Sequence, residues 1–324
     1  PLFSLCGKPV TFTGRGRLLE RPQDVYAKLF ADQKLPFEQT SEHIRICGPL
    51  RPDVFRVPGD VSSQFISGLL FALPLLAGTS HIEVLPPYES RSYVDLSRRG
   101  LAQAGLVIRG ADDALEIPGG QVYQAGDQSV EGDDSQMAFF AGLAAVSGIG
   151  CEVTGMNRGS IQADHAVLRI LKEMGLDVEA TEGGYRFRPA SLKAAAIDLG
   201  DCPDLGPVLF AAATQAQGTS EFLHVSRLRI KESDRIACMQ EELAKLGARM
   251  KAEEDRVIIE GRTVVHPAAE LDGHNDHRIV MALSVLASAA DAPVTIRGIE
   301  AVEKSYPAFY EDLAKAGMKV EVLK

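Results

Sequence analysis

The segment RLRIKESDR, residues 227–235, carries charge on six of its nine side chains, and the signs are mixed. The residues that follow have the pattern of a helix that begins inside this run, with Glu232 or Ser233 near its N-cap. Arg229 and Lys231 then lie in the turn before a helix N-terminus, where backbone N–H groups and the helix dipole favour anions. The segment indicates an anion site with a carboxylate beside it, although a solvated helix cap gives the same local pattern.

Composition and charge limit the classes of protein to which the chain can belong. Its 324 residues suffice for two domains, and 45% hydrophobic with 24% charged residues is typical of a globular protein. The net charge of -10 argues against nucleic acid or an anionic membrane as the main partner. The five cysteines contain no CxxC pair, which indicates neither a zinc site nor a disulfide framework and favours a reducing compartment, the cytoplasm. The longest apolar run, residues 65–78, is too short to cross a bilayer and predicts a buried helix.

The elements that must position these charges repeat about every seventy residues. Four segments share a polar glycine-containing cap, an apolar helix and a strand, and their marker glycines are Gly59, Gly132, Gly200 and Gly273. An amphipathic helix follows in each repeat and stops at Gly105, Gly175, Gly247 and Gly317. Short strands are expected next, such as LVIRG, LDVEA, ARMKAE and MKVEV. Each repeat therefore predicts the order strand, helix, strand, helix and strands.

The first helix of each repeat is apolar on nearly all sides, which is typical of a helix buried all round. We expect these helices to be bundled inside with sheets outside, in two groups, and their N-termini to face a shared cleft that favours an anionic ligand. Residues 1–14 match the end of such a helix. The chain is therefore expected to start partway through a repeat.

Eight motifs occur in an order that resembles the EPSP synthase family: GRGRLLERP, GDVSSQF, ESRSYVD, VEGDDSQ, CPDLG, LRIKESDR, HNDHRIVMA and AVEKSYPAF. The resemblance implies an α/β fold of two domains, each built from three repeated β-α-β-α-β units, with residues 1–129 in the shikimate-phosphate-side domain and 130–324 in the second. Six such units exceed this chain by about a hundred residues. The first domain is therefore expected to lack its N-terminal part, with the family's Lys-Ser pair, and the chain alone to have little activity.

The resemblance also implies a reaction, the transfer of the enolpyruvyl group of phosphoenolpyruvate to the 5-hydroxyl of shikimate 3-phosphate with release of phosphate. One proton must be removed from the hydroxyl and one delivered to the methylene carbon, which suits paired carboxylates. By motif match, Asp204 is the expected base, Glu232 handles the methylene proton, and Lys231 lies between the substrates. Without the resemblance, Asp204 reads equally well as a plain helix cap.

The remaining matched residues are expected to bind the substrates' phosphates and carboxylate, for which guanidinium groups are suited. The phosphoenolpyruvate set is Arg17, Arg235, Arg278 and Lys304, with His277 beside it. The shikimate-phosphate set is Ser62, Ser63 and Ser90, and Gln64 matches a residue that touches both substrates, although DVSSQ is also a good capping sequence. Arg227 matches a variable place in the family and is left unassigned. The cations are expected to converge on the gap between the domains.

Two alternatives remain open from the sequence. The related UDP-N-acetylglucosamine enolpyruvyl transferase shares the fold but relies on a loop cysteine, and the matching segment GRGRLLERP has none. The other alternative is a non-catalytic fragment of the fold. No cofactor is expected, and neither is a metal, since His274 and His277 lack an apparent third ligand. A monomer acting on small molecules, without a nucleic-acid or membrane partner, is the expected state.

Overall fold

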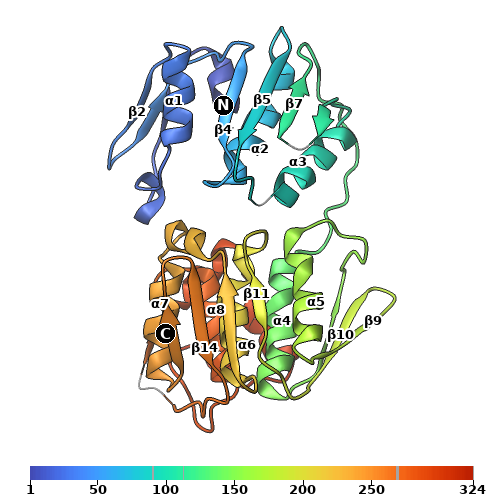
Figure 1. The fold of residues 1–324 in the computed structure, drawn as a ribbon, viewed down its shortest axis with the longest axis vertical. Helices are drawn as coiled ribbons and strands as arrows, with labels where there is room; N and C mark the ends of the chain where they lie inside the picture. The colour runs from blue at the N-terminus through green and yellow to red at the C-terminus, as the bar shows by residue number, and fades with distance from the viewer. Residues whose placement is uncertain (90, 112, 268–269, 324) are drawn as a thin grey trace. The chain divides into compact units, whose positions relative to one another are not determined.

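The computed structural model describes residues 1–89, 91–111, 113–267 and 270–323. The chain divides into two compact units, Pro1–Ser129 and Val130–Lys324 (Figure 1), and each has its own hydrophobic core. Among the described residues, every helix is too short or too polar to cross a membrane.

The first unit contains two small sheets. Its first half comprises η1 (Leu2–Cys6), β1 (Val10–Phe12), η2 (Gly16–Leu19), α1 (Asp24–Asp32), β2 (Phe37–Gln39) and β3 (Ile44–Ile46). Its second half comprises β4 (Val54–Pro58), α2 (Ser63–Ala72), η3 (Leu73–Leu75), β5 (Ser80–Leu85), α3 (Arg91–Gln103), β6 (Arg109–Ala111) and β7 (Ala114–Ile117). The sheets have the orders β1-β3-β2 and β4-β5-β7-β6, and β4 and β5 are parallel.

The second unit contains three further repeats. The first comprises α4 (Asp134–Ser147), β8 (Cys151–Thr154), η4 (Ala163–His165), α5 (Ala166–Glu173), β9 (Asp177–Ala180) and β10 (Gly184–Arg188). The next comprises β11 (Ala196–Asp198), η5 (Pro203–Leu205), α6 (Gly206–Gln215), β12 (Thr219–Leu223), η6 (Ser226–Ile230), α7 (Arg235–Lys245), β13 (Arg249–Ala252) and β14 (Arg256–Glu260). The last comprises β15 (Leu271–Asp272), α8 (His277–Ala287), β16 (Ile296–Arg297), η7 (Ile299–Lys304) and α9 (Phe309–Lys315).

The structure confirms the predicted order of elements for the repeats marked by Gly59 and Gly200, whereas the repeat marked by Gly132 has no strand in residues 118–133 before α4. The sheet order β11-β12-β14-β13 of the second unit equals the order β4-β5-β7-β6 of the first, with one parallel and two antiparallel pairings in each. The four predicted stop glycines all have a left-handed backbone, with φ of 78, 109, 89 and 104°. Glycine adopts this conformation without steric cost and so ends each amphipathic helix at the same place.

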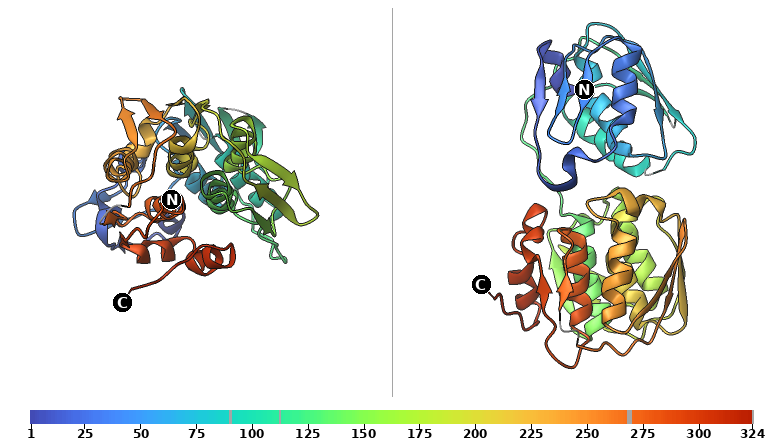
Figure 2. Two further views of the ribbon diagram at one scale, coloured as in Figure 1. Left: turned by 90° about the horizontal axis from the view of Figure 1, so that it is seen from below. Right: turned by 90° about the vertical axis from the view of Figure 1, so that its left-hand side faces the viewer.

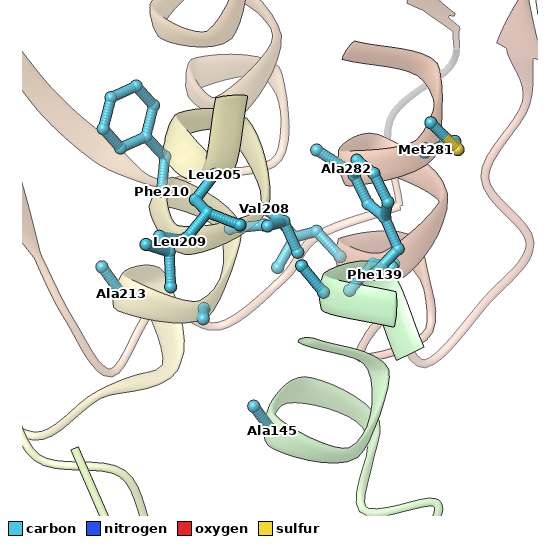
Figure 3. Close-up of a cluster of buried hydrophobic side chains, with 14 of the residues drawn as sticks. Phe139, Ala145, Leu205, Val208, Leu209, Phe210, Ala213, Met281 and Ala282 are labelled. Carbon is cyan, nitrogen blue, oxygen red and sulfur yellow. The ribbon is translucent and has the colours of Figure 1, made fainter. Parts of the chain in front are cut away.

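The apolar helices α4, α6 and α8 form the interior of the second unit. These three helices contact one another, and the side view in Figure 2 (right) shows the yellow and orange strands of β11 to β14 at the outer edge of this unit's helices. Phe139 of α4, Val208 of α6 and Ala282 of α8 meet between the helices, whereas Phe210 points away from them (Figure 3) and packs edge-on against Phe222 of the sheet. The predicted arrangement, helices inside and sheets outside, is confirmed here.

Two local predictions are wrong. The segment MKVEV after Gly317 forms no strand, since no strand among the described residues supplies it with a ladder of hydrogen bonds. The helix α2 is not buried all round, because Phe71 is 41% exposed. The N-cap of α7 is Asp234, whose carboxylate accepts a hydrogen bond from the Ala237 amide (3.0 Å), so this helix begins inside the charged segment, as predicted, with Ser233 directly before its N-cap.

Candidate active site

Asp204 is the centre of a charged cluster in the second unit. It lies in η5, the turn that leads into α6, and its carboxylate is surrounded by three cations. Its Oδ1 accepts a hydrogen bond from Arg235 Nη1 (2.9 Å) and lies 3.5 Å from Lys231 Nζ. Its Oδ2 accepts a hydrogen bond from Arg278 Nη2 (3.1 Å). Residues from three separate motifs are thereby brought together around one carboxylate.

The same cluster joins the N-terminal ends of three helices. Arg278, in the first turn of α8, donates to the Ser135 hydroxyl in the first turn of α4 (3.2 Å) and to the carboxylate of Asp204 just before α6. Helix N-termini carry unpaired N–H groups and a partial positive charge. The shared anion-favouring end that the sequence predicts is therefore present within this unit.

Asp276 anchors the first turns of α7 and α8 to each other, a role that the sequence motifs did not indicate. Its carboxylate is fully buried and caps α8 by accepting from the Arg278 amide (3.0 Å). It also accepts from Arg235 Nε (2.8 Å) and the Ser233 hydroxyl (3.0 Å). An aspartate just before an apolar helix signals an N-cap in the sequence, but its pairing with Arg235 is a tertiary contact that the local pattern does not show.

Glu232 lies at a second position in the cluster. Its Oε2 lies 3.2 Å from His277 Nδ1 and 3.5 Å from Lys304 Nζ. Lys304, the last residue of η7, also donates to the backbone carbonyl of Asn275. A carboxylate, an imidazole and an ammonium group therefore adjoin one another, a combination able to store and transfer a proton.

The local charges set the protonation of both carboxylates. Burial alone would raise the pKa of Asp204, but the positive charges of Arg278, Lys231 and Arg235 outweigh burial and hold this pKa well below its usual range. Burial would also raise the pKa of Glu232. The hydrogen bond and the charge of His277 outweigh burial, so the pKa of Glu232 is lowered. The pKa of Lys231 is lowered mainly by burial.

We expect the second unit to lose stability in acid. Burial would raise the pKa of Asp276, but Arg235 lowers it below its usual value, and the pKa of Asp204 is lowered as well. The unfolded chain therefore binds these protons more readily than the folded chain. The stabilisation is complete above about pH 5 and declines as the pH falls below the unfolded Asp pKa of about 3.9. Urea unfolding midpoints between pH 7 and pH 3 measure this decline, and a flat profile would contradict the described ion pairs.

The first unit holds the other predicted site residues. Arg17 lies in η2 with its side chain 53% exposed, 3.9 Å from Glu20. Ser62 is the N-cap of α2 and accepts a hydrogen bond from the Gln64 amide (3.3 Å), while Ser63 is buried in the first turn. The capping role expected of DVSSQ is therefore present. The predicted site residue Ser90 lies outside the described residues.

Two groups of side chains have spacing that could hold a metal ion, and each contains one of the histidines considered from the sequence. Glu232, Asp276 and His277 form one group, and Glu241, Glu242 and His274 form the other. The two histidines thus fall into separate groups, each with carboxylates that the sequence analysis did not assign to them. In both groups a cation already adjoins a carboxylate, Arg235 beside Asp276 (2.8 Å) and Lys245 beside Glu242 (2.7 Å).

The fold defines the class of protein. The enolpyruvyl transferase NikO from Streptomyces tendae superposes on 98% of this chain and 74% of its own with a TM-score of 0.78, at 17% identity. EPSP synthase from Acinetobacter baumannii superposes on 98% of this chain and 76% of its own with a TM-score of 0.76, at 27% identity. The chain therefore has the enolpyruvyl transferase fold.

The sequence comparisons then give the family. The family model of EPSP synthase (3-phosphoshikimate 1-carboxyvinyltransferase) matches residues 1–313. The 3-phosphoshikimate 1-carboxyvinyltransferase of Clostridium kluyveri is 41% identical over 324 residues, which are 99% of this chain and 76% of that relative. The chain belongs to the EPSP synthase family.

Proposed function

We propose that this protein transfers the enolpyruvyl group of phosphoenolpyruvate to the 5-hydroxyl of shikimate 3-phosphate and releases phosphate. One observation carries the proposal beyond family membership. The cations Lys231, Arg235 and Arg278 surround Asp204 within 3.5 Å, and Glu232 adjoins Lys304. Phosphoenolpyruvate offers a phosphate and a carboxylate, and two guanidinium groups with an ammonium group match these oxygens in charge and geometry.

Binding of phosphoenolpyruvate changes the electrostatics that hold the two carboxylates ionised. In the free site, Asp204 and Glu232 are kept ionised by their cationic neighbours. The negative charges of bound phosphoenolpyruvate offset those positive charges and so raise both carboxylate pKa values. Asp204 can then take the proton of the attacking hydroxyl, which forms the new C–O bond to phosphoenolpyruvate.

Glu232 supplies the other proton transfer. Protonated Glu232 delivers a proton to the methylene carbon as the C–O bond forms, and the resulting carboxylate recovers the methyl proton when phosphate leaves, while the proton held by Asp204 goes to the leaving phosphate. His277 hydrogen-bonds to Glu232 (3.2 Å) and holds its carboxylate in place, while Lys231 sits between the substrates. Arg17, Ser62, Ser63, Gln64 and Ser90 stay proposed ligands of the substrates.

The test is a phosphate-release assay on the full-length natural protein. Release is expected only when phosphoenolpyruvate and shikimate 3-phosphate are both present, and mass spectrometry of the product should show one added enolpyruvyl group. UDP-N-acetylglucosamine as the acceptor should give no release, since the family match does not favour that alternative. Turnover with the nucleotide sugar, or none with shikimate 3-phosphate, would contradict the proposal. The monomeric state and cytoplasmic location stay predictions.

A further inference from the structure

The connection between β15 and α8, loop 273–276, has a constrained backbone. His274 and Asn275 have φ of 50 and 51°, in the left-handed region that residues with side chains rarely adopt. A side chain at Gly273 would collide with Val280 Cγ2 (2.3 Å) and the Arg297 carbonyl (2.8 Å). Such a backbone persists only where surrounding contacts hold it. The contacts of loop 273–276 therefore determine where the following residues lie.

One face of α7 holds this loop at two points. Arg235 and Glu242 are seven residues apart, which is two helical turns, so they lie on the same face. Arg235 donates to Asp276 at the α8 end of the loop. Glu242 holds the β15 end, because its Oε2 accepts from the Asp272 amide (3.1 Å) and its Oε1 lies 2.9 Å from His274 Nε2.

Glu242 is fully buried and has no part in the proposed reaction. Lys245 Nζ donates to its Oε1 at 2.7 Å and also lies 3.4 Å from Glu241. The ammonium group of Lys245 thus balances the negative charge of Glu242, which a bound metal ion would otherwise balance. Asp272 Oδ1 accepts from the His274 amide (2.6 Å), which ties the histidine to the same place from its backbone side. These contacts indicate that Glu242 and His274 hold loop 273–276 in place and do not bind a metal ion.

The loop held in this way presents an acceptor to the active site. The Asn275 carbonyl accepts from Lys304 Nζ, and the same ammonium group lies 3.5 Å from Glu232 Oε2. We propose that Glu242 and His274 are a positioning pair, which fixes loop 273–276 so that Asn275 holds Lys304 beside Glu232. The inference rests on the proposed function where it takes Lys304 as a ligand of phosphoenolpyruvate.

The first test is kinetic and uses the full-length protein. His274→Asn tolerates the left-handed backbone but is too short to reach Glu242. It should raise the KM for phosphoenolpyruvate about tenfold, since a small misplacement of a binding group has large effects, and leave the KM for shikimate 3-phosphate within about twofold. Glu242→Gln should act in the same direction. Glu241→Gln is the control, because Glu241 also pairs with Lys245 but has its side chain 60% exposed.

A double-mutant cycle with Lys304→Ala identifies the route. If the pair acts through Lys304, His274→Asn should change the KM for phosphoenolpyruvate by less than about twofold in the Lys304→Ala background. Independent effects that multiply fully in the double variant would overturn the inference, and so would equal changes for both substrates.

Hydrogen exchange separates this inference from the proposed function. Both His274→Asn and Glu242→Gln should speed exchange of the amides in residues 272–276, while the amides of α4 keep their protection. Unchanged exchange in both variants overturns the positioning pair even in an active enzyme. Faster exchange in a protein that never releases phosphate from phosphoenolpyruvate contradicts the proposed function and supports the positioning pair.

Discussion

Asp204→Asn is expected to lower kcat by about a hundredfold to ten-thousandfold, the usual contribution of a positioned acid or base. The amide can still hydrogen-bond to Arg235 and Arg278, but it cannot take a proton. The substitution also removes the negative charge that three cations surround. Phosphoenolpyruvate should therefore bind as tightly as before, or more tightly, while turnover falls.

Steady-state kinetics and calorimetric titration with phosphoenolpyruvate measure the two effects separately. Asp198→Asn is the matched control, because Asp198 also pairs with a potential cation, His224 (2.9 Å), but has its side chain 63% exposed at the end of β11. The kcat of Asp198→Asn should stay within about twofold of the kcat of the natural enzyme. Natural turnover in Asp204→Asn would exclude Asp204 as the base.

Arg235→Ala is expected to give the largest loss of stability. The Arg235 side chain is 3% exposed and pairs with Asp204 and with the fully buried Asp276. Its removal leaves Asp276 buried without its countercharge, for which about 3–5 kcal/mol is typical. For a unit of this size, each kcal/mol lowers Tm by about 2–4 °C, so we expect a decrease of about 10 °C.

Arg186→Ala provides the comparison for this change. Arg186 also pairs with two carboxylates, Glu152 (2.7 Å) and Glu179 (3.3 Å), but its side chain is 42% exposed. Exposed ion pairs contribute about 0–1 kcal/mol, so its Tm should hardly move. Calorimetry measures Tm for both variants. Similar small decreases in Tm would mean that the buried position of Arg235 does not make its ion pairs stronger.

Much of the fold could be predicted because local sequence patterns indicate each element of the repeat. The apolar helices, the polar residues at their start and the stop glycines each reflect a short-range preference of the chain. The strand expected at MKVEV shows where prediction from local sequence fails. A strand forms only beside another strand, and the residues of MKVEV do not show whether such a partner is present. The exposed Phe71 of α2 has the same cause: burial depends on neighbours that the helix's own sequence does not specify.

The candidate site was predicted through motifs rather than through geometry. The motif match selected Asp204, Lys231, Arg235 and Arg278, and the structure brings them into one cluster. It did not select Asp276, although HNDHRIVMA contains it, and its pairing partner Arg235 lies 41 residues away in sequence. Long-range pairings of buried charges are the part that sequence patterns do not contain. The roles of the selected residues stay predictions.

The close approach of α4 and α6 has a consequence for the chemistry at their ends. A methyl group at Gly142 would lie 2.5 Å from Val208 Cγ2, so the two helices are as near as a bare backbone permits. Gly142 lies eight residues after Asp134, about 12 Å along α4 from the first turn. A larger residue there would spread the helices and separate Ser135 from Asp204, both of which Arg278 bridges. The width of the anion site is therefore set partly by an uncharged contact inside the protein, out of reach of any substrate.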